Sequence, residues 1–352
     1  MNIVENPFRG AGIQSPVLDA VPAPSTDAAR PANLVSQCPR AAQTPLVSSQ
    51  DLAERAGVGA VFVKDERGRM ALGSFKALGA AYVIARAAEV RTAAGRTYVT
   101  ASAGNHGLSV AAGAAAFGAH AVIYIAETVP EAFAMRLREQ GAEVVREGAA
   151  YEDSMAAAAT AAKDNGWELL SDSSWPGYVE PPLILMEGYL VLMDEAIRQM
   201  QDQAGKAPTH ILLQAGVGGL AGACAALARA VWGDAPSIIV VEPEFAPALA
   251  GSISAGQPVD TAGPVSSMGR LDCKEPSLIA LKGLSRDADV FVTITEDEAR
   301  LGTEICADIG LESTPSGTAG VSALLAAGTL RDELGLTNSS CVLAILSEGP
   351  EM

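Results

Sequence analysis

A single lysine, Lys76, stands in apolar surroundings that favour a reactive amine. It lies in LGSFKALGAA (72–81), where a phenylalanine precedes it and no acidic residue is within three positions, although the chain has 41 Asp and Glu residues. Burial disfavours the charged ammonium form and is expected to lower the pKa of this lysine. The neutral amine is a nucleophile that can bond to a carbonyl carbon. On this segment alone, a surface lysine whose aliphatic stem covers an apolar helix remains the alternative.

A glycine-rich turn further along the chain is typical of an anion-binding site. The stretch HILLQAGVGGLAGA (210–223) predicts a strand, a turn and a helix. Glycines let backbone N–H groups approach a ligand closely, and the dipole of the following helix adds partial positive charge. We therefore expect an anion to bind at Gly216, Val217, Gly218, Gly219 and Leu220. A tight turn with glycines for packing alone is the alternative.

The same turn also fits a dinucleotide-binding fingerprint. Gly216, Gly218 and Ala221 satisfy a relaxed GxGxxA pattern, and Glu242 closes the next strand, near the position of a ribose-binding acid. Taken alone, this segment favours a nicotinamide dehydrogenase. One such fingerprint is weak evidence, so the other motifs must decide.

A second loop has a similar design. In VTASAGNHGLSV (99–110) a strand is followed by a helix start, and the loop residues are Ser102, Ala103, Gly104, Asn105 and His106. Two anion-binding loops suit a pair of ligands with separate negative groups, such as a cofactor phosphate and a substrate carboxylate. His106 is also explained as an ordinary turn histidine.

A serine follows the last predicted strand. The apolar run CVLAIL (341–346) predicts a buried strand, which would place Ser347 at the carboxyl end of a sheet. Ligands of α/β proteins bind at this end of the sheet. By itself, Ser347 is also explained as a turn residue.

Composition excludes several classes of protein. The net charge is −17 without a basic cluster, which opposes binding to nucleic acid or to an anionic membrane surface. No stretch reaches the apolar length of a membrane span, and the first residues lack the pattern of a signal peptide. The five cysteines are scattered and form no CxxC pair, so reduced thiols in a cytoplasm fit best and a zinc site is not expected.

The candidate residues need a scaffold of buried strands and helices. Strands are predicted at 60–63, 97–100, 121–126, 168–171, 210–215, 237–241, 290–294 and 341–346, and helices at 75–88, 130–140, 151–165, 183–203, 220–232 and 317–334. Strands buried on both faces and separated by helices indicate an α/β fold with parallel sheets. We expect the strands to divide between two sheets, after an irregular N-terminal arm over about 6–42.

Taken together, the motifs resemble those of the fold-type II pyridoxal phosphate enzymes, the tryptophan synthase β-like superfamily. GSFKALGA, SAGNHG, AGVGGLAG, PSGTAG and LSEG occur in the order and spacing of that family. The diaminopropionate ammonia-lyase branch is the most similar, through QTPL (43–46), FVKDERGRMALGSFKALGAAYVIA (62–85), DSSWPGY (172–178), THILLQAGVGGLAG (209–222) and VVEPE (240–244). A dehydrogenase explains only one of these motifs.

The resemblance implies a role for most of the candidate residues. Lys76 would hold pyridoxal 5'-phosphate as a Schiff base, with Phe75 and Asn105 beside the cofactor ring. The loop from Gly216 to Leu220 would bind the phosphate, and Ser347 would face the pyridine nitrogen. The substrate carboxylate would bind at the second loop, on Ser102, Ala103, Gly104, Asn105 and His106.

The resemblance also implies the architecture. We expect an N-terminal arm (1–45), a large cofactor-binding domain (46–79 and 181–352) and a small substrate-carboxylate domain (80–180). The cofactor would lie in the cleft between the two domains. The family also implies a homodimer.

The implied reaction is β-elimination from a small β-substituted amino acid, which gives a 2-oxo acid and ammonia. A neutral serine at the ring nitrogen makes the cofactor a weaker electron sink, which suits loss of a β leaving group. A serine/threonine or 3-hydroxyaspartate dehydratase and a β-replacement synthase remain alternatives.

The chain departs from the ammonia-lyase branch at three places. Ala103 stands where the branch has an aspartate that acts as a base, so SAGNHG reads like the loop of serine and threonine dehydratases. Asp172 matches a second acidic residue of the branch and is predicted to act as acid or base. Arg270 replaces a small residue, and the hypothesis is that it faces the site and selects a substrate with a second carboxylate, while a solvated surface turn is the alternative. Ala248 replaces an aspartate that some relatives use with Glu242 to bind a cation, so no metal site is predicted.

Overall fold

Short aliphatic and β-branched runs form the strands of two sheets in the computed structural model, which describes residues 1–350. The larger sheet has the order β1 (Asn2–Glu5), β10 (Val290–Ile294), β9 (Ser237–Pro243), β8 (His210–Gln214), β11 (Cys341–Leu346), β3 (Ala60–Asp65) and β2 (Leu46–Ser48). Its five central strands are parallel, and β1 and β2 are antiparallel edges. All six residues of β11 are buried, as expected of a strand covered on both faces.

The smaller sheet is entirely parallel. It has the order β6 (Glu143–Arg146), β5 (His120–Ile125), β4 (Thr97–Ala101) and β7 (Glu168–Leu169). The α/β class and the division of the strands between two sheets are therefore as predicted.

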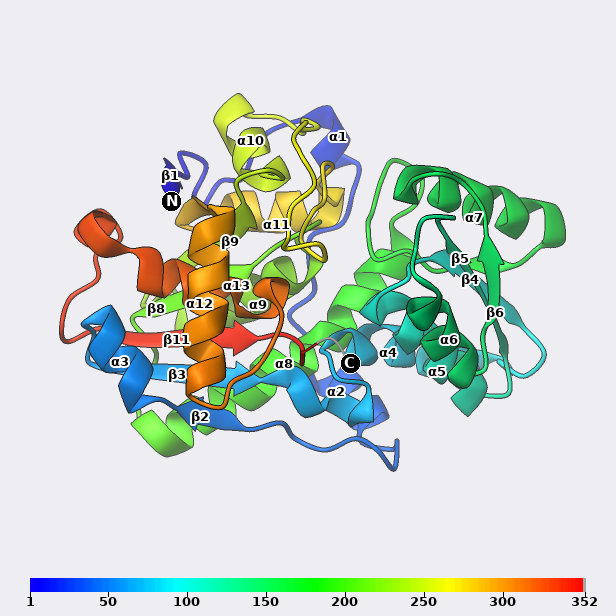
Figure 1. Ribbon diagram of the computed structural model, residues 1–352, viewed down its shortest axis with the longest axis horizontal. Coiled ribbons are helices and arrows are strands. Elements are labelled where there is room, and N and C mark those ends of the chain that lie inside the picture. Colours follow the sequence, from blue (N-terminus) through cyan, green and yellow to red (C-terminus); the bar gives the residue numbers. More distant parts are fainter. Residues whose placement is uncertain (351–352) are drawn as a thin grey trace.

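Helices cover both sheets. They are α1 (Pro16–Asp19), α2 (Ala29–Val35), α3 (Gln50–Ala56), α4 (Lys76–Val90), α5 (Asn105–Ala116), α6 (Glu131–Glu139), α7 (Tyr151–Asn165), α8 (Glu180–Ala204), α9 (Gly219–Trp232), α10 (Ala248–Ala255), α11 (Leu278–Asp287), α12 (Glu296–Asp308) and α13 (Pro315–Ala326). The short 3₁₀ helices are η1 (Glu66–Ala71) and η2 (Gly328–Leu330). Figure 1 shows two lobes, with α5, α6 and α7 around the smaller sheet and α4 and α8 running between the lobes. None of the described helices is long and apolar enough to cross a membrane.

The prediction of an irregular arm over 6–42 is wrong for two segments, which form α1 and α2. Both helices are held by burial of apolar side chains, since Leu18 and Val35 are buried. Before them, β1 pairs with β10 and extends the larger sheet.

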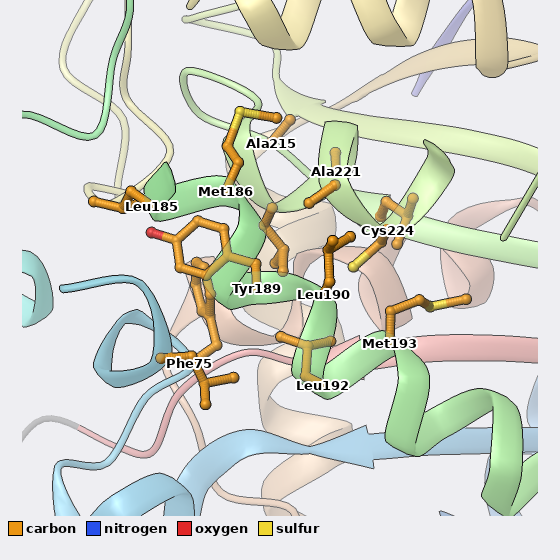
Figure 2. Close-up of a cluster of buried hydrophobic side chains, with 14 of the residues drawn as sticks. Phe75, Leu185, Met186, Tyr189, Leu190, Leu192, Met193, Ala215, Ala221 and Cys224 are labelled. Atoms are coloured by element: carbon orange, nitrogen blue, oxygen red, sulfur yellow. The ribbon is translucent and has the colours of Figure 1, made fainter. Parts of the chain in front are cut away.

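The helices α4 and α8 pack in close contact. A Cβ atom on Gly188 would lie 2.6 Å from the carbonyl oxygen of Leu78, and one on Gly79 would lie 2.8 Å from Leu185. These distances are too short for any side chain, so the two glycines allow the helices to pack backbone to backbone. Figure 2 shows apolar side chains of α8, including Leu185 and Tyr189, in a buried cluster with Phe75. The contact therefore fixes the position of α4, which starts at Lys76, against α8.

Candidate active site

Lys76 begins α4 and is placed by contacts with the chain after β11. The backbone N–H of Phe75 donates to the carbonyl of Ser347 at 3.1 Å, and Ser74 forms an antiparallel bridge with Glu348. The Ser74 hydroxyl accepts from the N–H of Lys76 at 3.1 Å. The lysine and the end of the central strand are therefore parts of one hydrogen-bonded unit.

The amine of Lys76 lies against two aromatic rings. Its Nζ atom is 5.2 Å from the ring centroid of Phe75 and 5.8 Å from that of Tyr189. The two rings pack edge to face at 4.8 Å, as Figure 2 shows. The surroundings of Lys76 are thus largely apolar, as the sequence predicted, and its side chain is 21% exposed. The alternative of a lysine with its amine out in water does not fit this position.

Asp172 is the ion-pair partner of Lys76, with contact between Oδ2 and Nζ. Burial is the largest single effect and lowers the pKa of Lys76, but the charge and hydrogen bond of Asp172, together with the nearby Tyr189 and Cys273, raise the pKa above its ordinary value. The predicted lowering of this pKa is therefore wrong for the protein without a ligand. The sequence could not show the reason, since the carboxylate is 96 positions away. Burial opposes the charge of Asp172 as well, yet Lys76 holds the pKa of Asp172 below its ordinary value.

His106 is more than a satisfied turn histidine. Its Nε2 lies 2.8 Å from the carbonyl oxygen of Leu170 and must donate to it, because a carbonyl only accepts. The other ring nitrogen, Nδ1, is buried without a partner among the described residues. Burial lowers the pKa of His106, and the nearby charge of Asp172 opposes that effect. The neutral ring therefore keeps a free acceptor nitrogen close to the Lys76–Asp172 pair.

The glycine-rich turn connects β8 to α9 beside the lysine. A Cβ atom on Gly219 would lie 3.7 Å from the ring of Tyr189 and 3.9 Å from the carbonyl oxygen of Asp172. Gly218 has φ of +97°, a conformation that favours glycine, and α9 starts immediately after it. The first N–H groups of α9 have no partner within the helix and can bind an anion. Val217 and Leu220 flank these glycines in the same turn.

Close packing leaves no room for a side chain at Gly216. A Cβ atom there would lie 2.9 Å from Sγ of Cys273 and 3.1 Å from the carbonyl oxygen of Arg270. The carbonyl of Val217 accepts from the N–H of Ser277 at 3.0 Å. The turn is therefore held against the segment that leads into α11.

The second loop starts α5 and depends on one glycine. A Cβ atom on Gly107 would lie only 2.1 Å from the carbonyl oxygen of Ser102, so no other residue fits. The hydroxyl of Ser102 accepts from the N–H of Gly104 at 3.3 Å. Ser102, Ala103, Gly104 and Asn105 are half-buried. Their backbone therefore borders on solvent at the start of a helix.

A buried carboxylate, Glu348, joins the two lobes. It accepts from the side-chain amide of Asn105 and from the hydroxyl of Thr314, and its Oε2 lies 3.1 Å from Nε of Arg270. Arg270 therefore faces the site, since its Nε would lie 4.0 Å from a Cβ atom on Gly104. Asn105 is engaged by Glu348 here, where the resemblance implied a cofactor oxygen as its partner.

The carboxylate of Glu242 is engaged by backbone groups of its own chain. Glu242 is fully buried, and its carboxylate accepts the N–H groups of Leu249 and Ala250, both at 2.8 Å, at the start of α10. A carboxylate engaged in this way cannot reach a ribose, which removes the support for the dehydrogenase alternative. Within residues 1–350 no cluster of three or more His, Cys, Asp or Glu side chains could hold a metal ion. The absence of a metal site stays a prediction.

Sequence reasoning missed three residues of the site: Tyr189, Cys273 and Glu348. The hydroxyl of Tyr189 is buried without a hydrogen-bond partner in the described chain, and burial raises its pKa. Burial also raises the pKa of the Cys273 thiol, to about 12. A signal existed only for Glu348, which directly follows Ser347 in the LSEG motif.

Comparison with known proteins gives one consistent result. The family model "Pyridoxal-phosphate dependent enzyme" matches residues 39–348. Diaminopropionate ammonia-lyase of Escherichia coli K12 is 33% identical over 335 residues, which cover 87% of this chain and 84% of that protein. A mouse serine dehydratase-like protein is 29% identical over 255 residues, 72% of each chain.

The fold is also that of a solved structure. The crystal structure of the Escherichia coli diaminopropionate ammonia-lyase, in complex with an aminoacrylate-PLP azomethine reaction intermediate, superposes with a TM-score of 0.88. The two chains are 32% identical, and the match covers 99% of this chain and 93% of the other.

Proposed function

Because the chain belongs to the family of pyridoxal-phosphate dependent enzymes, we propose that it is a lyase acting on a small β-substituted amino acid, with a 2-oxo acid and ammonia as products. The observation that carries this proposal is the position of the Lys76 amine, which lies beside Asp172 and next to the glycine-rich turn. The similarity to diaminopropionate ammonia-lyase supports the same reaction class.

The residues of the cleft fit pyridoxal 5'-phosphate. Lys76 supplies the amine, the turn from Gly216 to Leu220 supplies N–H donors without side-chain obstruction, and Phe75 and Tyr189 supply apolar walls. Ser347 supplies a neutral hydroxyl for the ring nitrogen. When bound, the cofactor supplies an aldehyde carbon and an electron-withdrawing ring.

Lys76 and Asp172 carry the proton transfers. The amine must be neutral to act as a nucleophile or to accept a proton from the substrate Cα, and Asp172 is the acceptor placed to receive its proton. Asp172 can then return a proton to the departing β-substituent. The N–H groups of the loop from Ser102 to His106 bind the substrate carboxylate and orient Cα toward the amine.

Loss of water rather than ammonia is the second candidate. The loop carries Ala103, and a serine dehydratase-like protein is among the relatives. This favours a serine/threonine or 3-hydroxyaspartate dehydratase. β-Replacement, in which an added nucleophile captures the intermediate, is the third.

We further propose that the enzyme is a cytoplasmic homodimer with the domains 46–79 plus 181–352 and 80–180. The five cysteines are free thiols, which suits a reducing compartment. The dimer rests on the family resemblance.

Release of ammonia and 2-oxo acid from a panel of small amino acids tests the reaction. The panel is serine, threonine, 2,3-diaminopropionate and 3-hydroxyaspartate, each as D and L isomers, with and without a thiol acceptor. Elimination predicts a 2-oxo acid without any acceptor. Product formation only with the acceptor would establish replacement, and no product from any substrate would contradict both.

A further inference from the structure

A cavity with an excess of positive charge borders the candidate site. It has a volume of about 490 Å³, and its lining includes Asn105 together with Arg67, Arg136 and Arg270, against one acidic residue, Asp65. The arginines come from both lobes, because Arg136 lies on α6 and the other two lie in the larger lobe. Such a collection of cations is unexpected in a chain of net charge −17.

The three arginines differ in their partners. Arg67 pairs with Asp65 at 2.8 Å and with Glu312 at 3.4 Å, and Arg270 pairs with Glu348 at 3.1 Å. Arg136 forms no hydrogen bond or ion pair that involves residues 1–350, and it is only half-buried. It therefore brings an uncompensated charge to the cavity.

Two other arginines on or near α6 have an ion-pair partner, because both contact Glu131. Arg138 lies 2.5 Å from Glu131, and Arg146 lies 2.7 Å from the same carboxylate. No such partner is provided for Arg136, although it stands two positions from Arg138. This difference between neighbouring arginines points to a ligand as the partner of Arg136.

Packing holds Arg136 next to the second loop. Its neighbour Leu137 is buried, and a methyl carbon of Leu137 lies 3.2 Å from the position of a Cβ atom on Gly107. This contact fixes α6 against the start of α5, where Asn105 lines the same cavity. The helix that carries Arg136 is therefore held against the second loop by the core.

We propose that Arg136 binds a second acidic group of the substrate, so that the enzyme acts on β-substituted amino acids whose side chain ends in a carboxylate, such as 3-hydroxyaspartate. This inference rests on the proposed function, since the first carboxylate is bound at the loop from Ser102 to His106. A guanidinium presents two parallel N–H donors that match a carboxylate. Arg270 lines the same cavity and adds positive charge, while its pairing with Glu348 leaves Arg136 as the main partner.

Substitution of Arg136 with a matched control tests the inference. We compare the native enzyme with Arg136→Ala and Arg138→Ala, and measure kcat/KM for 3-hydroxyaspartate and for serine. Loss of a charge-assisted hydrogen bond costs about 1.5–3 kcal/mol. The kcat/KM for 3-hydroxyaspartate, divided by the kcat/KM for serine, should therefore fall about 10- to 100-fold in Arg136→Ala. In Arg138→Ala the ratio should stay at the native value.

Binding of succinate, measured by calorimetry on the holoenzyme, provides a readout independent of turnover. We expect native protein and Arg138→Ala to bind succinate, and Arg136→Ala to bind it at least about tenfold more weakly. Equal succinate binding by all three proteins, or an unchanged substrate ratio in Arg136→Ala, would overturn the inference. If the native enzyme turns over no amino acid but Arg136→Ala alone loses succinate binding, the proposed reaction fails while the anion site stands.

Discussion

At the scale of single residues, the main effect is the competition between burial and charge at Lys76. Burial lowers the pKa of an amine, and a carboxylate in contact raises it. In this structure Asp172, with smaller contributions from Tyr189 and Cys273, overcomes burial and raises the pKa of Lys76, which favours the protonated amine.

Asp172→Asn is expected to have two effects. It removes the charge that raises the pKa of Lys76, so covalent attachment of pyridoxal phosphate to apoprotein should proceed at lower pH than in the native protein. It also removes a proton carrier, so the elimination rate should fall about 10²- to 10⁴-fold. The visible absorbance of the attached cofactor, followed against pH, measures the first effect.

Asp194→Asn is a suitable control for this experiment. Asp194 forms a surface pair with Arg198 one helical turn away, 2.7 Å apart on α8, and has no part in the site. An identical pH profile in native protein and Asp172→Asn would show that Asp172 does not control the amine.

At the scale of elements, each candidate loop connects the carboxyl end of a buried parallel strand to a helix. The sequence predicted the central strands of the larger sheet well, because β8, β9 and β11 consist mainly of buried apolar residues. It did not predict β1, β2 and β6, which are short strands at the sheet edges with exposed or half-buried residues. Pairing with a neighbour, rather than a local apolar pattern, makes these segments strands.

The helix α10 provides a test of stability against pH. Burial raises the pKa of Glu242 to about 8 from its ordinary value of 4.5. The folded state therefore binds a proton that the unfolded state has released, and Glu242 makes the protein less stable as the pH rises from about 4.5 to about 8. At 1.36 kcal/mol per pKa unit, the loss of folding free energy is on the order of 5 kcal/mol.

Thermal unfolding of the native protein, Glu242→Gln and Glu244→Gln between pH 5 and pH 8.5 checks this expectation. Because glutamine does not titrate, the native protein should lose stability relative to Glu242→Gln as the pH rises. Glu244 is exposed two positions further on, and its variant should follow the native curve. A constant difference between native protein and Glu242→Gln at all pH values would refute the assignment.

At the scale of the whole molecule, a buried charge network holds the segment that precedes the lysine. Lys64 and Arg69 each lie 2.7 Å from the carboxylate of Glu195 on α8, and Arg69 also pairs with Glu66 at 2.8 Å. Removing one member of such a network leaves an unpaired buried charge, which is strongly unfavourable. The network therefore fixes β3 and η1 to α8, the helix that also supports Tyr189.

Some residues of the cleft between the lobes are far apart in sequence, so the sequence alone did not predict that they lie close together. The motifs placed Lys76, the glycine-rich turn and the second loop in one site, because each motif carries a local signature. Arg136 has no such signature, and the LSEG motif marks the position of Glu348 without showing that its carboxylate contacts the second loop. Asn105 and Glu348, for example, are 243 positions apart.

The most direct test of the account is the site of cofactor attachment. The protein is incubated with pyridoxal phosphate, reduced with borohydride to make the carbon–nitrogen bond permanent, digested and analysed by mass spectrometry. The account predicts the added mass on the peptide that contains Lys76, and its loss in Lys76→Ala. Attachment at another lysine such as Lys206, or no attachment at all, would contradict it.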